Sequence, residues 1–373
     1  MSLLVKNGMV YDPLSNTVSK KEIWVKTEEK ASCYEEVDAK NCYVIPGMID
    51  SHAHVNRKNG GFGTDADLLC IPNGVTTVID AGSLGVNKIE EFILEEISEY
   101  ITDTRVLLNL SSRGQDLLIT ETFEEQSVNE QLILELYQKY SHVIKGLKVR
   151  YEKDSIRESG LLPLKKCIQL SEILESNGYR CPVTVHLGNM GEQVSLMRLL
   201  EMMRPGDVLA HMYQDKGEMI FDEKGKLKTS VREAREKGVL FDFAHGRTNF
   251  TFHNLRNAAL ENFWPDLLGT DIHGGNIYKL PACSFMCTIS MMNAAGMALT
   301  DIFKASTCTP AMVWGLEERK RDFDVNGGMN FSIIEKRRKD AVLQDIKEDT
   351  LVLNEVFHTK ALIKNGKVIY KQL

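Results

Sequence analysis

The hydrophobic pattern of the chain changes twice, so that two β-rich ends enclose a middle built on a different plan. Short apolar runs of strand character occupy residues 3–10 and 22–26, with an Asn-Gly turn signal in the first of them. Residues 349–373 repeat this style around a second Asn-Gly. Because both ends share one pattern, we expect a small β domain assembled from residues 1–47 and 325–373.

The middle of the chain, residues 48–324, alternates strand and helix at regular intervals. Helical patterns lie at residues 86–100, 128–140, 164–175, 193–203, 231–237 and 252–262. The predicted strands are residues 48–54, 75–81, 105–111, 144–150, 182–187, 207–212, 239–245 and 267–272, and the helical patterns alternate with them. These eight repeats predict a closed parallel (β/α)8 barrel, a TIM barrel, in which active sites lie at the carboxyl ends of the strands.

Residues with metal-binding chemistry stand at the carboxyl ends of several predicted strands. The first strand ends in Asp50-Ser-His-Ala-His54, where His52 and His54 are two residues apart and so share one face. The fifth, sixth and eighth strands end in His186, His211 and Asp271, respectively. Because these ends meet at one rim of a barrel, we expect the side chains to lie together.

The fourth predicted strand contributes a lysine to the same rim. Its sequence, Ile144-Lys-Gly-Leu-Lys-Val-Arg150, holds two lysines of opposite parity, so only one can point into the barrel. If Leu147 and Val149 face the surrounding helices, Lys148 faces inward. A lone histidine or aspartate at a strand end is usually a hydrogen-bonded loop residue, but six candidate ligands at one rim favour a metal site. Imidazole and carboxylate suit Zn²⁺ or a similar divalent ion.

The composition narrows the class of protein. The 373 residues carry a net charge of −7 without a dense block of Lys and Arg, which argues against nucleic acid and favours a small-molecule substrate. We expect a cytoplasmic protein without membrane contact, because the sequence holds no membrane-length apolar run and no charged-then-apolar leader. The eight cysteines are scattered, which predicts reduced thiols in the core; Cys283 and Cys287 could share a helix face, where packing is favoured over a metal site.

These motifs resemble the amidohydrolase superfamily of barrel metal hydrolases, over essentially the whole chain. Pro46-Gly-Met-Ile-Asp-Ser-His-Ala-His54 matches the signature of that superfamily, and a discontinuous β domain is typical of it. Other segments look most like its deacetylase-type branch, whose members are often labelled adenine deaminase or dihydroorotase. These segments are residues 74–82, 146–150, 185–188, 209–212, 244–246 and 269–273.

The resemblance implies two divalent metal ions, most simply Zn²⁺, and a carbamate formed from CO₂ on a lysine. By position, His52, His54 and Asp271 would bind one ion, His186 and His211 the other, and the Lys148 carbamate would bridge them together with a hydroxide. An unmodified lysine, with an ordinary pKa near ~10.4, is a cation and would repel the ions. The bridging hydroxide would act as nucleophile, and Asp271 as general base and then general acid.

Three further residues are predicted to contact substrate. His245, at the end of the seventh predicted strand, matches the His-Gly of this branch; the alternatives are that it braces a metal ligand or is a purely structural histidine. His273 lies in the eighth loop, and Arg150 ends the fourth strand, where it could hold a carboxylate. The glycine-rich loop at residues 57–64 fits either a lid over the site or an irregular turn.

We therefore expect a dinuclear metal-dependent amidohydrolase that cleaves an amide or ester bond of a small molecule, with deacetylation of an acylated amino or hydroxy acid as the specific hypothesis. Hydrolysis of a cyclic amide, of the dihydroorotase or hydantoinase type, and adenine deamination are the alternatives. Mononuclear deaminases of the superfamily typically lack the lysine and carry a glutamate where this chain has Asn189. A non-enzymatic scaffold is disfavoured because all six ligand positions are filled. Relatives are often dimers or larger oligomers, so a homo-oligomer is expected by analogy alone.

Overall fold

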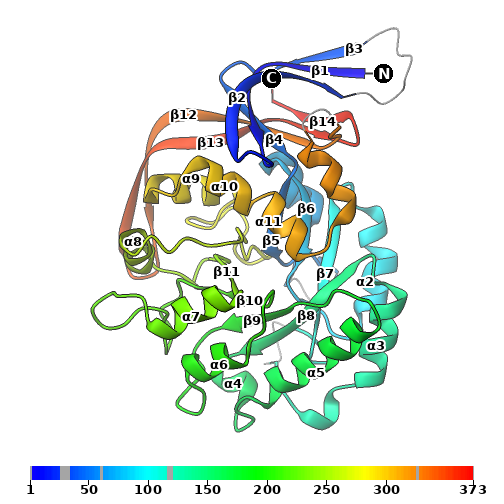
Figure 1. The fold of residues 1–373 in the computed structure, drawn as a ribbon, viewed down its shortest axis with the longest axis vertical. Coiled ribbons are helices and arrows are strands. Elements are labelled where there is room, and N and C mark those ends of the chain that lie inside the picture. Colours follow the sequence, from blue (N-terminus) through cyan, green and yellow to red (C-terminus); the bar gives the residue numbers. More distant parts are fainter. Residues whose placement is uncertain (1, 26–33, 59–61, 116–120, 325–326, 373) are drawn as a thin grey trace.

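The computed structural model describes residues 2–25, 34–58, 62–115, 121–324 and 327–372, which form two sheets (Figure 1). One sheet is parallel and curls into a barrel with helices around it. The other lies beside the barrel and contains strands from both ends of the chain, so the two termini lie on the same side of the molecule (Figure 1). Each described helix is too short or too polar to cross a lipid bilayer.

Seven parallel strands build the barrel in their order along the chain. They are β5 (Met48–Ala53), β6 (Val75–Asp80), β7 (Asp103–Asn109), β8 (Ile144–Tyr151), β9 (Val183–Leu187), β10 (Val208–Ala210) and β11 (Leu240–Asp242). Sequential parallel strands joined by short helical crossovers are the arrangement that the repeating pattern predicts. The TIM-barrel class is therefore confirmed.

The eighth predicted strand, residues 267–272, is not a regular strand. It joins the barrel through single bridges from Leu267 to Asp242 and from Ile272 to Ala53. Asp271 has a φ of +55°, in the left-handed region that does not occur in a regular β ladder. The prediction of a strand is wrong in conformation here, although the segment does close the gap between β11 and β5.

Helices cover the outer face of the barrel, and they bury their apolar sides against it. In α3, for example, Ile133, Leu136 and Tyr137 are buried while the first residues of the helix face solvent. The α-helices are α1 (Ala66–Cys70), α2 (Ile89–Glu95), α3 (Glu130–Lys139), α4 (Lys153–Ile156), α5 (Leu162–Ser176), α6 (Leu196–Met202), α7 (Thr229–Lys237), α8 (Phe252–Leu260), α9 (Phe285–Ala295), α10 (Leu299–Ala305) and α11 (Cys308–Val313). Short 3₁₀ helices are η1 (Ile71–Asn73), η2 (Ile97–Glu99), η3 (Glu125–Ser127) and η4 (Glu317–Phe323).

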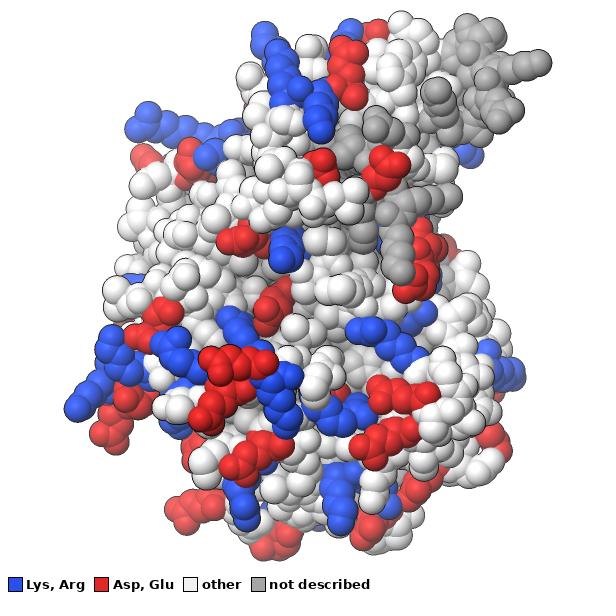
Figure 2. Space-filling view, viewed as in Figure 1, with Lys and Arg blue, Asp and Glu red and all other residues white. Residues whose placement is uncertain are grey.

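Acidic and basic side chains are interspersed over the helices in the lower half of the face that Figure 2 shows. Exposed ion pairs join neighbouring helices, for example Lys139 of α3 with Glu90 of α2 at 2.7 Å. Exposed pairs of this kind contribute little to stability, because water screens them. The fold therefore depends mainly on the buried apolar layer between the strands and the helices.

The second sheet has the order β14-β13-β12-β4-β1-β2, with β3 paired to β1. Its strands are β1 (Ser2–Asp12), β2 (Thr17–Val25), β3 (Tyr34–Asp38), β4 (Cys42–Pro46), β12 (Phe331–Gln344), β13 (Thr350–Lys364) and β14 (Lys367–Lys371). The β4–β12 pair joins the two ends of the chain. The exact domain limits at 47/48 and 324/325 stay a prediction, and the second one borders residues 325–326, outside the described part of the chain.

The two Asn-Gly signals behave differently. Asn365-Gly366 forms the turn between β13 and β14, with both residues at positive φ. Asn7-Gly8 is not a turn, because β1 continues through it and its pairing with β2 shifts register between Val5 and Gly8. The chain reverses after Asp12 instead, and the first Asn-Gly marks a bulge.

The long β12–β13 ribbon fastens the second sheet to the barrel helices. Near its tip, Asp345 Oδ2 accepts a hydrogen bond of 2.7 Å from the backbone N–H of Phe252, at the start of α8. Further along, the Phe357 N–H donates to Ser290 Oγ on α9 at 2.9 Å. The ribbon thus lies across the helices that follow the last barrel strands (Figure 1).

A buried arginine ties the amino-terminal end of the barrel together. The Arg319 guanidinium donates to Thr76 Oγ1 at 2.9 Å, Thr77 Oγ1 at 2.7 Å and the Gly47 carbonyl at 2.7 Å. Its Nε lies 2.8 Å from Asp322 Oδ2, and both side chains are almost fully buried. One side chain from η4 therefore links the starts of β5 and β6.

We expect Arg319→Met to lower the free energy of unfolding by about 3 kcal/mol, because it leaves the Asp322 carboxylate buried without its cation. The midpoint of urea denaturation, followed by circular dichroism, measures this loss. Arg337→Met is the control, since Arg337 pairs with Glu335 on the exposed ribbon, and it should leave the midpoint unchanged. Equal midpoints for Arg319→Met and the wild type would contradict the structural role of Arg319.

Candidate metal centre

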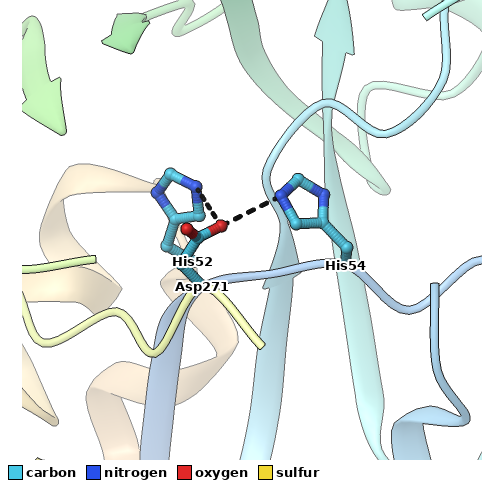
Figure 3. A group of neighbouring side chains, drawn as sticks. All are labelled: His52, His54 and Asp271. Carbon is cyan, nitrogen blue, oxygen red and sulfur yellow. Dashed lines mark ion pairs between the residues drawn. The ribbon is translucent and has the colours of Figure 1, made fainter. Parts of the chain in front are cut away.

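At the carboxyl end of the barrel, His52 of β5 and His54, one residue beyond that strand, converge with Asp271 of the closing segment (Figure 3). Asp271 Oδ1 lies 3.2 Å from His54 Nε2 and 3.6 Å from His52 Nε2. The three residues are at most 8% exposed. They lie together because His52 and His54 share one face of β5, while Asp271 is held beside them by a hydrogen bond of 2.6 Å from its N–H to the His52 carbonyl.

Hydrogen bonds behind the two rings fix which nitrogen carries the proton. His52 Nδ1 lies 3.0 Å from Asp242 Oδ2, and a carboxylate there accepts an N–H. His54 Nδ1 lies 2.8 Å from Ser83 Oγ, whose own hydrogen goes to Asp80 Oδ2 at 2.7 Å, so the hydroxyl oxygen accepts from the ring. With hydrogen on both Nδ1 atoms, each Nε2 presents a lone pair.

The Asp271 carboxylate is fixed in the same way. Asn249 Nδ2 donates to Asp271 Oδ2 at 2.8 Å, which leaves Oδ1 directed at the imidazoles. Gly246 allows this approach, because a Cβ there would lie 2.5 Å from Asp271 Oδ2.

This donor set fits a divalent cation. Nε2 of His52, Nε2 of His54 and a carboxylate oxygen of Asp271 all lie within 4.8 Å of one another. Each presents an electron pair, and no hydrogen atom lies between them in the tautomers that Asp242 and Ser83 select. Such a group is repulsive by itself and becomes favourable around a metal ion, for which two imidazoles and a carboxylate are suitable ligands.

A second pair of imidazoles continues the cluster. The His211 ring lies 4.2 Å from that of His186 and 5.0 Å from that of His52, between centroids. His211 Nδ1 is 2.6 Å from the Ala244 carbonyl, and its buried Nε2 has no partner among the described residues. Burial lowers the pKa of His52, His186 and His211 well below the usual range, so all three are neutral.

Lys148 enters the same space from β8. It is 1% exposed, and its Nζ has no hydrogen-bond partner among the described residues. Burial lowers the pKa of Lys148 to about 8, against the opposing pull of Asp271 and Asp242. Gly82 makes room for it, because a Cβ there would lie 2.5 Å from the Lys148 Cβ. Burying an amine without a hydrogen-bond partner costs free energy, so this lysine is a candidate for a functional role.

The predicted substrate contacts occupy three different environments. His245 is fully buried, with Nδ1 2.7 Å from the Gly246 carbonyl and Nε2 2.8 Å from Thr288 Oγ1, so both ring nitrogens have partners in the protein. His273 is half-buried and stacks on Phe62 at 5.2 Å between centroids. Arg150 is half-buried, on the face of β8 that carries Lys148, and its Nε has no partner among the described residues.

The structure describes only part of the loop at residues 57–64. Residues 59–61 lie outside the described part of the chain, so the prediction of a lid stays a prediction. Of its described residues, Phe62 packs 4.8 Å from the His54 ring, and its carbonyl accepts the Gly274 N–H at 2.8 Å. The Phe62 side of this loop is therefore joined to the loop that carries His273.

Sequence reasoning missed the residues that orient the candidate ligands. Asp242 and Asp80 both end barrel strands, so the rule that placed His186 and His211 at the rim could have found them. Ser83 follows Asp80 in the next loop and had no separate signal. Asn249 comes from the loop before α8, and only the folded chain brings it to Asp271.

Several known proteins resemble this chain over most of its length, although a scan against models of protein families returned no match. A protein named deacetylase from Enterococcus faecalis is 27% identical over 374 residues, which cover 98% of each chain. A deacetylase from Agrobacterium fabrum is 28% identical over 90% of this chain and 81% of its own. Among solved structures, an adenine deaminase has a TM-score of 0.86 at 25% identity, covering 99% of each chain, and a dihydroorotase has 0.85 at 24%, covering 99% of this chain and 98% of its own.

We expect Asp242→Ala to weaken binding of a divalent metal about 10- to 100-fold, because His52 loses the partner that fixes its tautomer and orientation. Competition against a chromophoric chelator, using protein stripped of metal and reloaded, measures this change. Asp266→Ala is a matched control, since Asp266 also accepts a backbone N–H, from Phe241 at 2.9 Å, but does not contact the cluster. Equal metal affinity in both variants would contradict the role assigned to Asp242.

Proposed function

We propose that this chain, which belongs to the amidohydrolase superfamily of metal-dependent hydrolases, removes an acyl group from an acylated amino or hydroxy acid. The observation that carries the proposal is the buried convergence of electron-pair donors from His52, His54 and Asp271 at the carboxyl end of a TIM barrel. The relatives named deacetylase align with nearly the full chain, whereas the curated adenine deaminases align with 28% to 64% of it. Coverage in the sequence comparison therefore supports deacylation over deamination, whereas the fold favours neither, because a solved adenine deaminase covers 99% of this chain.

In this proposal, His52, His54 and Asp271 hold one divalent ion, most simply Zn²⁺, and His186 and His211 hold a second. Lys148, whose buried Nζ has no partner among the described residues, would carry a carbamate as a further anionic ligand. The reason is electrostatic: a lysine ammonium would oppose two dications, whereas a carbamate is an anion with two oxygen ligands. Such ions lower the pKa of water towards neutrality and polarise a carbonyl oxygen.

In this proposal, Asp271 transfers a proton from the attacking water to the leaving group. Its Oδ2 is held by Asn249, so Oδ1 is the oxygen that faces the candidate metal ligands and is free to accept a proton from the attacking water. Asp271 then returns that proton to the leaving nitrogen or oxygen, as general base followed by general acid. The left-handed backbone at Asp271 and the hydrogen bond from its N–H to His52 keep the carboxylate in place for both steps.

Arg150 holds the carboxylate of the substrate. Its side chain lies on the same face of β8 as Lys148, and its Nε is buried without a partner among the described residues. A planar guanidinium binds a carboxylate through two parallel hydrogen bonds. A cavity of about 1030 Å³, lined by residues that follow β8, β9 and β10, has room for the remainder of the acid.

Glu152 connects this cavity with the cluster. Its Oε1 lies 3.4 Å from His186 Nε2, and its Oε2 accepts the Asn189 N–H at 3.2 Å. Asn189 itself is neutral and partly exposed at the cavity, where the mononuclear deaminases of the superfamily carry a glutamate. This position therefore lacks the acid that those deaminases use to protonate a ring nitrogen, which disfavours mononuclear deamination but does not bear on a dinuclear adenine deaminase.

The first test is metal content per chain, by elemental analysis of protein purified with bicarbonate and without chelator. We expect about two ions per wild-type chain and one or none in Lys148→Ala, because the anionic ligand is lost. Lys145→Ala is the matched control: Lys145 lies on the same strand with opposite parity and donates to the Ser141 carbonyl. A single ion that both variants retain would overturn the carbamate bridge.

We expect Asp271→Asn to keep most of its bound metal and to lose turnover by about 10²- to 10⁴-fold, because the amide cannot accept the proton. Acetate release from a panel of N-acetyl amino acids and O-acetyl hydroxy acids measures turnover. Ring opening of dihydroorotate and hydantoin, and ammonia release from adenine, are assayed beside it. Activity confined to these ring compounds would overturn deacylation, and near-wild-type turnover in Asp271→Asn would overturn the role of Asp271.

A further inference from the structure

A cavity of about 300 Å³, here called the α9 cavity, lies between α9 and the β12–β13 ribbon. Residues of η1 and β14 also line it, so both the barrel side and the second sheet enclose it. Ser290 and Phe357, which join α9 to the ribbon through the hydrogen bond described above, both belong to its wall. Its volume is at the lower end of the range for small-molecule sites, and none of the candidate metal ligands lines it.

Much of the wall of the α9 cavity is apolar. Leu343, Leu353 and Phe357 of the ribbon line it together with Met286 of α9, and all four belong to the buried core between the sheet and the barrel. Leu280 lines it as well and is 57% exposed. A hydrocarbon chain in the cavity would contact these side chains and leave water, which is the main driving force for binding an apolar group.

The polar part of the wall favours an anion. Lys339 lines the cavity, is exposed, and forms no ion pair with a described residue. No aspartate or glutamate is among the described residues that line it, although the whole chain has a net charge of −7. Thr359 is also part of the wall; it is 4% exposed, and its hydroxyl has no hydrogen-bond partner among the described residues. The wall therefore combines an unpaired cation with an unused hydroxyl.

The start of α9 adds to this positive character. Ser284, the N-cap residue, lines the cavity together with Met286 and Cys287 of the first helical turn. The N–H groups of a first turn have no carbonyl acceptor within the helix, and the helix dipole places partial positive charge there. The Cys287 N–H is taken by Ser284 Oγ at 3.2 Å, which leaves the N–H groups of Phe285 and Met286. Two separate elements, α9 and β12, thus make the cavity attractive to an anion.

Two cysteines show that the α9 cavity is open to small molecules. Cys283 and Cys287 both line it and are partly exposed, whereas four of the seven described cysteines are buried. The expectation that the two share a helix face is wrong, because Cys283 precedes the N-cap of α9. The Cys287 thiol donates to the Pro281 carbonyl at 3.2 Å, and among the described residues neither cysteine belongs to a group of three possible metal ligands. Both thiols are therefore suitable reporters of a bound molecule.

We propose that the α9 cavity binds a small carboxylate with a hydrocarbon chain, such as a medium-chain fatty acid. The chain lies against Leu343 and Phe357, and the carboxylate lies between Lys339 and the start of α9. A neutral molecule of the same shape makes the apolar contacts only, and a cation is repelled by Lys339 and by the helix dipole. The bound acid touches the helix that contacts the barrel rim, since Thr288 of α9 lies 2.8 Å from His245 Nε2.

The test is isothermal titration calorimetry of the full chain, with the metal it carries when purified, and octanoate as the probe. We expect octanoate to bind about tenfold more tightly than 1-octanol, and octyltrimethylammonium to bind more weakly than either. Lys339→Glu should weaken octanoate binding about tenfold and leave 1-octanol binding unchanged. Lys20→Glu is the matched control, because it makes the same change of charge at an exposed position of β2, three strands away from β12 in the same sheet.

Alkylation locates the bound probe. Saturating octanoate should slow the reaction of Cys283 and Cys287 with iodoacetamide severalfold, as followed by peptide mass spectrometry. It should not affect Cys308, which is partly exposed but does not line the cavity.

No step of this test measures catalysis, so its outcome is independent of the proposed function. Equal affinity for the three probes, unchanged octanoate affinity in Lys339→Glu, or alkylation of Cys283 and Cys287 at the same rate with and without octanoate would each overturn the proposal. The probe comparison and the alkylation use the wild-type chain, so they decide the question even if a variant does not fold.

Discussion

Two imidazole nitrogens and a carboxylate oxygen face each other across a buried space with no hydrogen atom between them. Residues of the barrel rim hold all three groups in this arrangement. His52 and His54 are locked from behind by Asp242 and by the Ser83–Asp80 pair, and Asn249 holds the far oxygen of Asp271. Each contact removes the rotation or proton transfer that would relieve the repulsion. The site is therefore organised for a cation before the cation arrives.

The need to hold these electron-pair donors together also affects the backbone conformation at the barrel rim. Asp271 has a left-handed φ of +55° and His211 one of +67°, which are unusual for residues other than glycine. Asp50 supports the first of these, because its carboxylate accepts hydrogen bonds from both the N–H and the hydroxyl of Thr270, the residue before Asp271. The segment that closes the barrel is irregular, and this irregularity places the Asp271 carboxylate beside the two imidazoles. In a regular strand, successive side chains would point to alternate faces of the sheet.

The repeating pattern of apolar runs was sufficient to predict the barrel, because each strand must be buried on both faces and each helix on one. Parity was sufficient to choose Lys148 over Lys145, since the two side chains of one strand must point to opposite faces. The apolar pattern could not reveal that residues 267–272 are irregular, because the left-handed backbone of Asp271 is imposed by contacts with β5 rather than by local sequence. Nor could it distinguish a bulge from a turn at Asn7-Gly8, where the same dipeptide suits both. Of the orienting residues, Asp242 ends a barrel strand and was within reach of the rim rule, whereas Asn249 is brought to the site by tertiary structure alone.

The pairing of β4 with β12 has a consequence for how the protein is made. Residues 42–46 leave the ribosome early, but their partner, residues 331–335, emerges only after the whole barrel. Until then, the edge of β4 has unpaired backbone groups of the kind that attract other chains. Synthesis therefore passes through a stage in which a finished barrel carries an unfinished sheet, and a premature stop before β12 would leave that edge open permanently. Only the last strands of the chain cover the edge of β4.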